Sequence, residues 1–302
     1  MSGNSAYTGR FAPSPTGPLH FGSLLAAIAS FLQAKMRSGG RWLLRIEDID
    51  PPREQPGADA AILRALETYG FEWDGAVSYQ SRSSDKHRAA LASLMEAGHA
   101  YRCSCSRQDL SATPRGPLGA IYPGTCRNGC RSGDTAIRVI THDRPVIFND
   151  LLQGQQSQRL ESESGDFVIQ RRDALIAYHL AVVVDDFEQG ISEVVRGVDL
   201  LDSTPRQIHL QRLLGYRTPA YAHIPVAVHP DGQKLSKLTG AAPISLDVVQ
   251  PTLVAGLQAL GQGPPAGLED ADLRDIWKWA LANWRIEPLA GHRSVAEPDR
   301  PA

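Results

Sequence analysis

A short extended segment near the start of the chain is followed by apolar residues at helical spacing. Residues 7–14 predict a strand that runs into a loop, and residues 41–46 predict a second, buried strand. Between them, glycines 39 and 40 end a predicted helix. The apolar positions of that helix are Leu24, Leu25, Ile28, Phe31 and Leu32. Strand, helix and strand in this order predict a βαβ unit of a parallel sheet, whose ligands bind beyond the carboxyl ends of the strands.

Similar patterns predict the remaining elements. Helices are expected over residues 62–69, 91–95, 245–261 and 270–284. Strands are expected over residues 135–148, 178–186, 191–197 and 222–228. Thr204 is predicted to cap a further helix, with Pro205 in its first turn and Gln207 completing a capping box. The alternation of strands and helices indicates an α/β protein with a parallel sheet.

The composition is that of an ordinary globular protein. The chain has 302 residues, of which 42% are apolar, and this is enough to fill a sizeable core. A net charge of -2 argues against indiscriminate coating of nucleic acid, although it allows a local basic groove. The chain opens with no basic-then-apolar leader and contains no apolar run of the roughly 20 residues that a membrane span needs. We therefore expect a cytoplasmic protein with no membrane partner. We also expect it to be a monomer.

The four cysteines all lie between residues 103 and 130, in a segment rich in Gly, Pro, Ser and Arg. In a reducing compartment, such a cluster indicates a metal site rather than a set of disulfides. Thiolates at this spacing suit a tetrahedral, structural Zn²⁺, which would supply the folding energy that a core-poor segment lacks. Spacing alone leaves open a site made of all four cysteines, including Cys130.

Two loops carry the strongest chemical signals. Prolines at positions 13, 15 and 18 stiffen the first loop, and the helix from about Gly22 points its first amides toward a bound anion. His20 would donate a hydrogen bond to a phosphate oxygen. A Pro/Gly turn beside a surface histidine explains this stretch equally well on local grounds. The second loop, 234-KLSK-237, favours the phosphate site, because Lys237 could close over the same phosphates.

Together these motifs resemble the signatures of class I aminoacyl-tRNA synthetases. PLHFG is similar to the HIGH signature, and KLSKL is similar to KMSKS. Five segments follow the glutamyl-tRNA synthetase pattern in order, namely GRFAPSPTGPLHFGSL, LLRIEDID, AVVVDD, RGVDLLDSTPRQ and KLSK. The resemblance implies a ligase in which the carboxylate of glutamate attacks the α-phosphate of ATP. Glutamyl-adenylate would then esterify a hydroxyl group of a nucleic acid.

The resemblance also implies the site residues. The glutamate pocket would contain Arg10, Phe11, Ala12, Pro13, Ser14, Glu47, Tyr178 and Arg196. ATP, with Mg²⁺, would be bound by His20, Gly22, Lys234 and Lys237. His20 and Lys237 would have catalytic roles. Two departures, Ser23 in place of a second histidine and Leu238 in place of serine, imply altered ATP contacts rather than lost activity.

One branch of the family is similar to this chain in both length and cysteine pattern. Only about 65 residues follow KLSK, whereas a glutamyl-tRNA synthetase continues into a helical anticodon-binding region. Cys103-Ser-Cys105 with 122-YPGTC-126 is similar to the CxC…YxxxC pattern of the glutamyl-queuosine tRNA(Asp) synthetases. That resemblance implies zinc ligands Cys103, Cys105, Tyr122 and Cys126. It also implies tRNA-independent activation of glutamate and its transfer to queuosine at the wobble position of tRNA(Asp).

The expected fold is a Rossmann-type parallel-sheet catalytic domain with a small zinc-binding insertion and a short, mainly helical C-terminal region. The expected divisions are 1–100 and 165–215 for the two Rossmann halves, 101–164 for the insertion, 216–290 for the C-terminal region and 291–302 for a disordered tail. Arginines of the insertion are expected to contact tRNA phosphates, namely Arg102, Arg107, Arg115, Arg127 and Arg131.

Three other functions are compatible with parts of the sequence. The first is a conventional glutamyl-tRNA synthetase that charges the 3′ end of tRNA and has its anticodon domain on a separate chain. The second is a nucleotidyltransferase that adenylates a small phosphorylated cofactor, which would leave Arg10, Glu47 and Arg196 unexplained. The third is a zinc-stabilised nucleic-acid-binding module without enzymatic activity, which would not need the loop of Lys237.

Overall fold

The computed structural model describes residues 7–117, 119–131, 133–229, 232–235 and 241–297. Its α-helices are α1 (Phe21–Lys35), α2 (Ala58–Thr68), α3 (Ser84–Glu96), α4 (Leu160–Glu163), α5 (Tyr178–Glu188), α6 (Thr204–Leu214), α7 (Val249–Ala259) and α8 (Leu273–Asn283). The strands of the central region are β1 (Thr8–Phe11), β2 (Arg41–Ile46), β3 (Ser78–Tyr79), β11 (Glu193–Gly197) and β12 (Ala220–Ile224). The other strands are β4 (Ala100–Cys103), β5 (Arg115–Gly116), β6 (Gly119–Ala120), β7 (Ala136–Val139), β8 (Pro145–Asp150), β9 (Gly154–Arg159), β10 (Val168–Gln170), β13 (Val226–Val228) and β14 (Ser294–Ala296).

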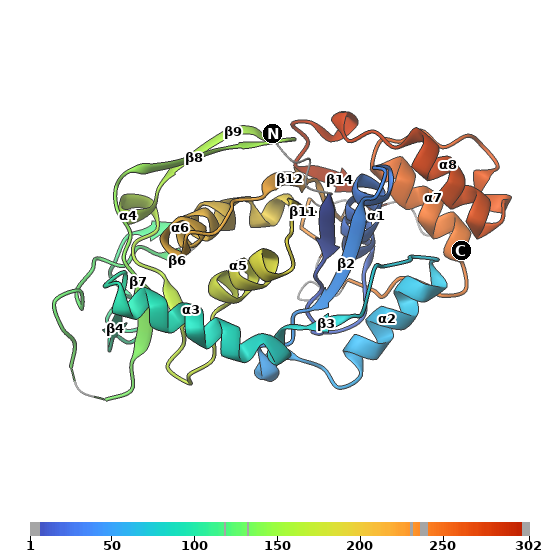
Figure 1. Cartoon of the computed structure of the whole chain (residues 1–302). Coiled ribbons are helices and arrows are strands. Elements are labelled where there is room, and N and C mark those ends of the chain that lie inside the picture. The colour runs from blue at the N-terminus through green and yellow to red at the C-terminus, as the bar shows by residue number, and fades with distance from the viewer. Residues whose placement is uncertain (1–6, 118, 132, 230–231, 236–240, 298–302) are drawn as a thin grey trace.

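The predicted βαβ unit is confirmed and forms the centre of the molecule (Figure 1). Strands β1 and β2 pair in parallel with Thr8 opposite Arg41, and helix α1 connects them. Strand β2 pairs in parallel with β3, and β11 pairs in parallel with β12. Thr8 and Ser192 exchange hydrogen bonds, which places β11 beside β1. The carboxyl ends of β1, β2 and β11 therefore lie close to one another.

Helices α7 and α8 cover the buried helix α1 at one end of the molecule (Figure 1). Trp277 of α8 meets the rings of Phe31 and Phe71, each at a centroid distance of 4.9 Å. Its indole nitrogen donates to the carbonyl of Tyr69 at 2.8 Å. The C-terminal helices thus complete the core of the βαβ unit rather than forming a separate one.

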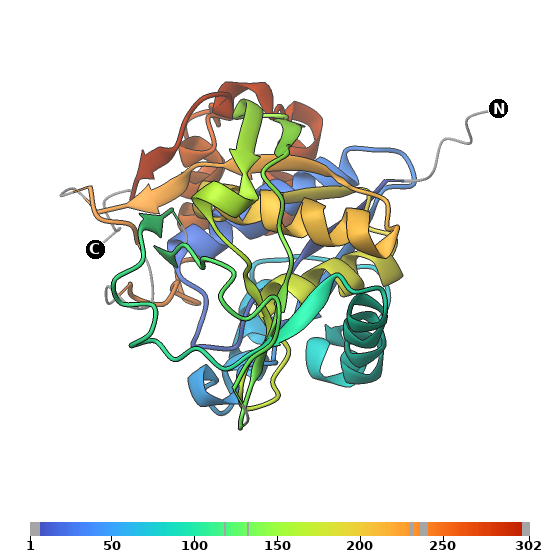
Figure 2. The ribbon, with the colours of Figure 1, turned by 90° about the vertical axis from the view of Figure 1, so that its left-hand side faces the viewer.

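The insertion lies at the opposite end of the molecule and consists of small antiparallel sheets and long loops (Figure 1). Strands β4 and β10 flank β7, while β8 and β9 form a hairpin that joins β12 at Asp150. Viewed from this end, the loops around β5 and β6 cross the front of the molecule (Figure 2). No helix in the described ranges has both the length and the apolar character that crossing a membrane requires.

The prediction of a strand over 178–186 is wrong, because these residues form helix α5. The seven residues from Leu180 to Asp186 are all buried, between α3, α6 and β10. Three consecutive valines favour a strand, yet a short apolar run fits a buried helix equally well, and packing decides between the two. The helix places Tyr178 in its first turn and Asp186 near its end.

Two smaller expectations are also corrected. Helix α6 begins at Thr204, but its N-cap residue is Ser203, because a 3-10 helix over Val198–Ser203 leads directly into it. The hydroxyl of Thr204 instead donates to the carbonyl of Leu200. The expected disordered tail is wrong for Ser294–Ala296, which pairs as β14 with β13, while residues 298–302 lie outside the described residues.

The contacts of Trp277 predict a large contribution to stability. Trp277 is only 7% exposed, so Trp277→Ala should lower the free energy of unfolding by about 3–5 kcal/mol. Trp279, on the same helix, is only partly buried and provides a matched control. Unfolding in urea gives the free energy of unfolding of both variants. An equal loss of stability in the two variants would contradict a core shared by α8 and the βαβ unit.

Candidate active site and metal centre

A cavity of about 370 Å³ lies at the carboxyl ends of β1, β2, β11 and β12. The predicted site residues in its lining are Arg10, Phe11, Ala12, Pro13, Ser14, His20, Gly22, Glu47, Tyr178, Arg196 and Lys234. The structure thus brings together every predicted glutamate and ATP residue that it describes. Lys237 and Leu238 lie outside the described residues. Sequence reasoning missed Asp199, which also lines the cavity.

Arg10 enters the cavity from the end of β1 and is neutralised by a buried carboxylate. Its Nε lies 3.1 Å from Oδ1 of Asp186, and Arg45 of β2 donates to the same oxygen at 2.7 Å. Burial alone would raise the pKa of Asp186, but the two guanidinium groups outweigh burial and hold this pKa below its ordinary value. Asp186 therefore stays ionised and fixes both arginines.

Arg196 lies near the end of β11 and has no carboxylate partner among the residues that the structure describes. Its Nε donates to Nε2 of His223 at 3.0 Å, and one terminal nitrogen donates to Oγ1 of Thr204 at 2.8 Å. The other terminal nitrogen, Nη1, is buried and makes no hydrogen bond within the described ranges. Because a buried, unsatisfied donor is costly, this nitrogen is suited to an anionic ligand in the cavity.

Glu47 and Tyr178 complete the polar lining between the two arginines. Burial raises the pKa of the Glu47 carboxyl above its ordinary value, although Arg45 and Arg10 oppose this rise. Burial also raises the pKa of Tyr178, so its hydroxyl keeps its proton and can donate a hydrogen bond. A ligand with an ammonium group would stabilise the ionised form of Glu47.

His20 is the N-cap residue of α1 and lines the same cavity. Its Nδ1 accepts a hydrogen bond from the backbone nitrogen of Ser23 at 3.2 Å, so a neutral His20 carries its proton on Nε2. A side chain at Gly22 would approach the His20 ring to 3.1 Å, which explains the glycine. Lys234 also lines the cavity, and its Nζ lies 2.7 Å from Oδ2 of Asp199.

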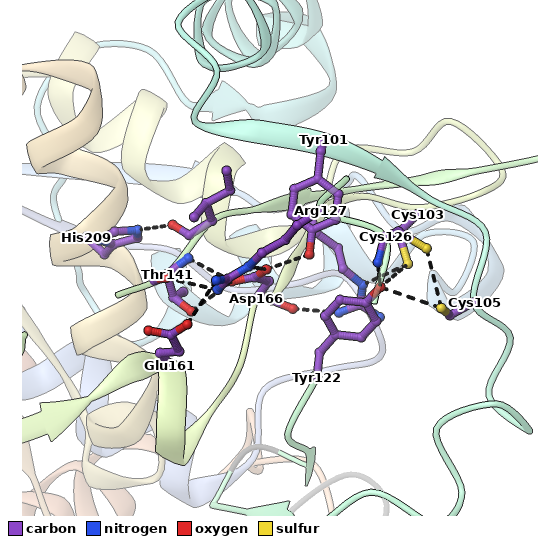
Figure 3. A network of polar contacts seen from close by, with 12 residues as sticks. Tyr101, Cys103, Cys105, Tyr122, Cys126, Arg127, Thr141, Glu161, Asp166 and His209 are labelled. Carbon is purple, nitrogen blue, oxygen red and sulfur yellow. Dashed lines mark hydrogen bonds and ion pairs between the residues drawn. The ribbon is translucent and has the colours of Figure 1, made fainter. Parts of the chain in front are cut away.

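A second group of residues gathers in the insertion as a candidate metal centre (Figure 3). The sulfur atoms of Cys103, Cys105 and Cys126 all lie within 4.8 Å of one another. The hydroxyl oxygen of Tyr122 lies 3.3 Å from the Cys103 sulfur and 3.5 Å from the Cys105 sulfur. Cys130 is exposed and is not part of this described cluster. Three thiols and a phenol therefore offer four donors around one point.

Arg138 contacts two of these four candidate ligands. Its Nε donates to the sulfur of Cys103 at 3.3 Å, and its guanidinium carbon lies 3.9 Å from the ring centroid of Tyr122. Arg138 therefore packs against two of the candidate ligands and helps to hold their side chains in place.

Arg127 anchors the cysteine loop instead of facing solvent (Figure 3). It donates to both oxygens of Asp166 at 2.7 Å and to Glu161 at 2.9 Å. Asp166 is completely buried and also accepts from Tyr101 and Thr141. The expectation that Arg127 contacts tRNA stays a prediction, for a side chain that is only partly exposed and already paired with two carboxylates. The other predicted arginines are exposed, namely Arg102, Arg107, Arg115 and Arg131.

Comparisons with known proteins agree with this geometry. Residues 7–252 match the model of the family described as tRNA synthetases class I (E and Q), catalytic domain. The chain is 53% identical to the glutamyl-Q tRNA(Asp) synthetase of Pseudomonas fluorescens, over 98% of both chains. It is 52% identical to the protein of that name from Dechloromonas aromatica, over 98% of this chain and 99% of the other.

A solved structure shows the same fold. The glutamate tRNA ligase from Elizabethkingia meningosepticum superposes with a TM-score of 0.80 at 24% identity, over 97% of this chain and 67% of that chain. The fold resembles a larger synthetase, whereas the sequence resembles relatives of the same length. The chain therefore belongs to the class I (E and Q) tRNA synthetase family, within its glutamyl-Q tRNA(Asp) synthetase branch.

Proposed function

We propose that this protein activates glutamate with ATP in the absence of tRNA and transfers the glutamyl group to queuosine at the wobble position of tRNA(Asp). The observation that carries the proposal is that Arg10, Glu47 and Arg196 line the same cavity as His20 and Lys234. Family membership argues against the nucleotidyltransferase and against the non-enzymatic binding module.

The cavity suits glutamate because its lining offers groups of opposite charge to the carboxylate and ammonium groups of that ligand. Nη1 of Arg196 would bind a carboxylate, and Glu47 would bind the ammonium group. Arg10, paired with Asp186, would orient the substrate through hydrogen bonds. We infer that Arg196 binds the side-chain carboxylate, which leaves the α-carboxylate to react.

The first step joins an oxygen of the α-carboxylate to the α-phosphorus of ATP and breaks the bond to the leaving pyrophosphate. Nε2–H of His20 and the ammonium of Lys234 would stabilise negative charge on the phosphates, and Lys237 would add a mobile charge from its loop. Mg²⁺ bound with ATP would neutralise further phosphate charge. In the second step, a hydroxyl of the acceptor attacks the activated carbonyl carbon, and AMP leaves.

The acceptor is inferred from the relatives. The chain is 52–53% identical, over nearly its full length, to proteins named glutamyl-Q tRNA(Asp) synthetase. Transfer to queuosine is therefore better supported than charging of the tRNA 3′ end.

We further propose that the insertion holds a structural Zn²⁺ through Cys103, Cys105, Tyr122 and Cys126. Three sulfurs and one oxygen around one point suit tetrahedral coordination that leaves no open position for substrate. The ion would stabilise loops that contribute few apolar residues to any core. Its role would be to hold the insertion in place rather than to act in the reaction.

The proposed chemistry predicts glutamate-dependent exchange between pyrophosphate and ATP without added tRNA. Lys237→Ala should lower the exchange rate by about 100-fold or more, because a charge that stabilises the transition state is lost. Lys278→Ala, at an exposed position on α8, should leave the rate unchanged. Exchange that occurs only when tRNA is added would instead indicate a conventional glutamyl-tRNA synthetase.

The proposed zinc site predicts about one bound zinc ion per chain. Cys105→Ser should reduce the zinc content measured by atomic absorption and lower the thermal stability of the insertion, because a thiolate ligand is lost. Cys130→Ser changes a cysteine of the same segment outside the cluster and should retain the metal. Loss of zinc in Cys130→Ser, with retention in Tyr122→Phe, would show that the fourth ligand is Cys130.

A further inference from the structure

A buried chain of hydrogen bonds leads from the end of strand β8 to the guanidinium of Arg196. His223 of β12 lies directly opposite Arg196 of β11 in the parallel pair, and Tyr221 of β12 lies opposite Asp150 of β8. The side chains of His223 and Asp150 are completely buried. Neither residue lines the cavity, whereas Arg196, which His223 contacts, does.

The contacts of Asp150 determine which nitrogen of His223 carries the proton. Oδ1 of Asp150 accepts from the backbone nitrogens of Leu152 and Gln153, at 3.0 and 2.9 Å. Oδ2 lies 2.5 Å from Nδ1 of His223. Burial alone would raise the pKa of Asp150, but the hydrogen bond from His223 and the backbone amides lower it, so the group is a carboxylate. A carboxylate only accepts hydrogen bonds, so Nδ1 of His223 must be the donor.

With its proton on Nδ1, His223 presents the lone pair of Nε2 to Arg196. Nε of Arg196 always carries a hydrogen, and it lies 3.0 Å from this lone pair. Thr204 provides the second acceptor, at 2.8 Å from one terminal nitrogen. The carbonyl of Leu200 lies 3.4 Å from the same terminal nitrogen. These three acceptors hold the plane of the guanidinium, and Nη1 is left without a hydrogen-bond partner among the described residues.

His223 fixes Arg196 without neutralising it. Burial lowers the pKa of His223 to about 4, despite the opposing effect of Asp150, so the ring is neutral near pH 7. Thr204 is neutral as well. Arg10, in contrast, is paired with the carboxylate of Asp186. Of these two arginines, Arg196 is therefore the one whose charge remains available to a ligand.

We propose that Asp150 and His223 are a positioning pair that orients Arg196 toward the side-chain carboxylate of glutamate. Asp150 selects the tautomer of His223, and this tautomer accepts the Nε hydrogen of Arg196. The inference rests on the proposed function, because it concerns the same pocket. If the pair only stabilised the packing of β8, β11 and β12, its substitution would lower the stability of the protein without a selective change in the KM for glutamate.

Asp150→Asn is the most informative substitution. The remaining Oδ1 still accepts from the backbone amides, but an amide donor replaces Oδ2. The Asn donor favours the other tautomer of His223, and Nε2–H would then face Nε–H of Arg196. We expect the KM for glutamate in pyrophosphate exchange to rise tenfold or more, while the KM for ATP stays within twofold.

A second pair of variants separates positioning from folding. Glutamine at position 223 can place an amide oxygen near the location of Nε2, whereas leucine offers no acceptor. His223→Gln should therefore raise the KM for glutamate less than His223→Leu does. Thermal unfolding of all variants shows whether their stability follows the same order as their KM for glutamate.

Arg196→Gln serves as the reference for the pocket itself. A raised KM for glutamate in Arg196→Gln, with wild-type values in Asp150→Asn and His223→Leu, would overturn the positioning pair and leave the proposed function standing. Equal increases in the KM values for glutamate and ATP in Asp150→Asn would overturn it as well. An unchanged KM for glutamate in Arg196→Gln would overturn the glutamate pocket, and the positioning pair with it.

Discussion

The buried carboxylate of Asp186 holds together the parts of the protein that form the active site. It binds Arg10 from β1 and Arg45 from β2, while its own helix, α5, follows the insertion in the sequence. One ionised side chain thus connects the two halves of the catalytic domain. Removing one partner of such a buried group typically costs about 3–5 kcal/mol, because the remaining charge is left uncompensated. The shape of the cavity depends on this contact.

The same principle underlies the proposed fit of the cavity to a dicarboxylic amino acid. Arg10 is neutralised, Arg196 keeps its charge, and burial raises the pKa of Glu47 until a cation binds. These groups are already in place before any ligand arrives, so little reorganisation is needed during the reaction. The candidate metal centre lies in the insertion, where Arg127 and Asp166 anchor its loop. The cavity and the candidate metal centre therefore lie in different parts of the chain.

Periodicity and motifs predicted much of this arrangement. Helix α1 has a regular apolar face between two strands, so its βαβ unit could be recognised directly. The valines of α5 misled the prediction, because a helix that is buried on most sides shows no polar face. Spacing could not choose between Tyr122 and Cys130, whereas the structure places only Tyr122 against the clustered sulfurs. The roles of Asp150, His223 and Asp186 depend on contacts between distant segments, and no local pattern marks them.

The acceptor is the central claim, and the position of the glutamyl group on tRNA tests it most directly. The enzyme would be incubated with ATP, radiolabelled glutamate and tRNA(Asp) that carries queuosine or unmodified guanosine at the wobble position. Ribonuclease digestion then separates the fragment with the anticodon from the fragment with the 3′ end. We predict label on the anticodon fragment of the queuosine tRNA and none on the unmodified tRNA. Label on the 3′ fragment of both tRNAs would contradict the account.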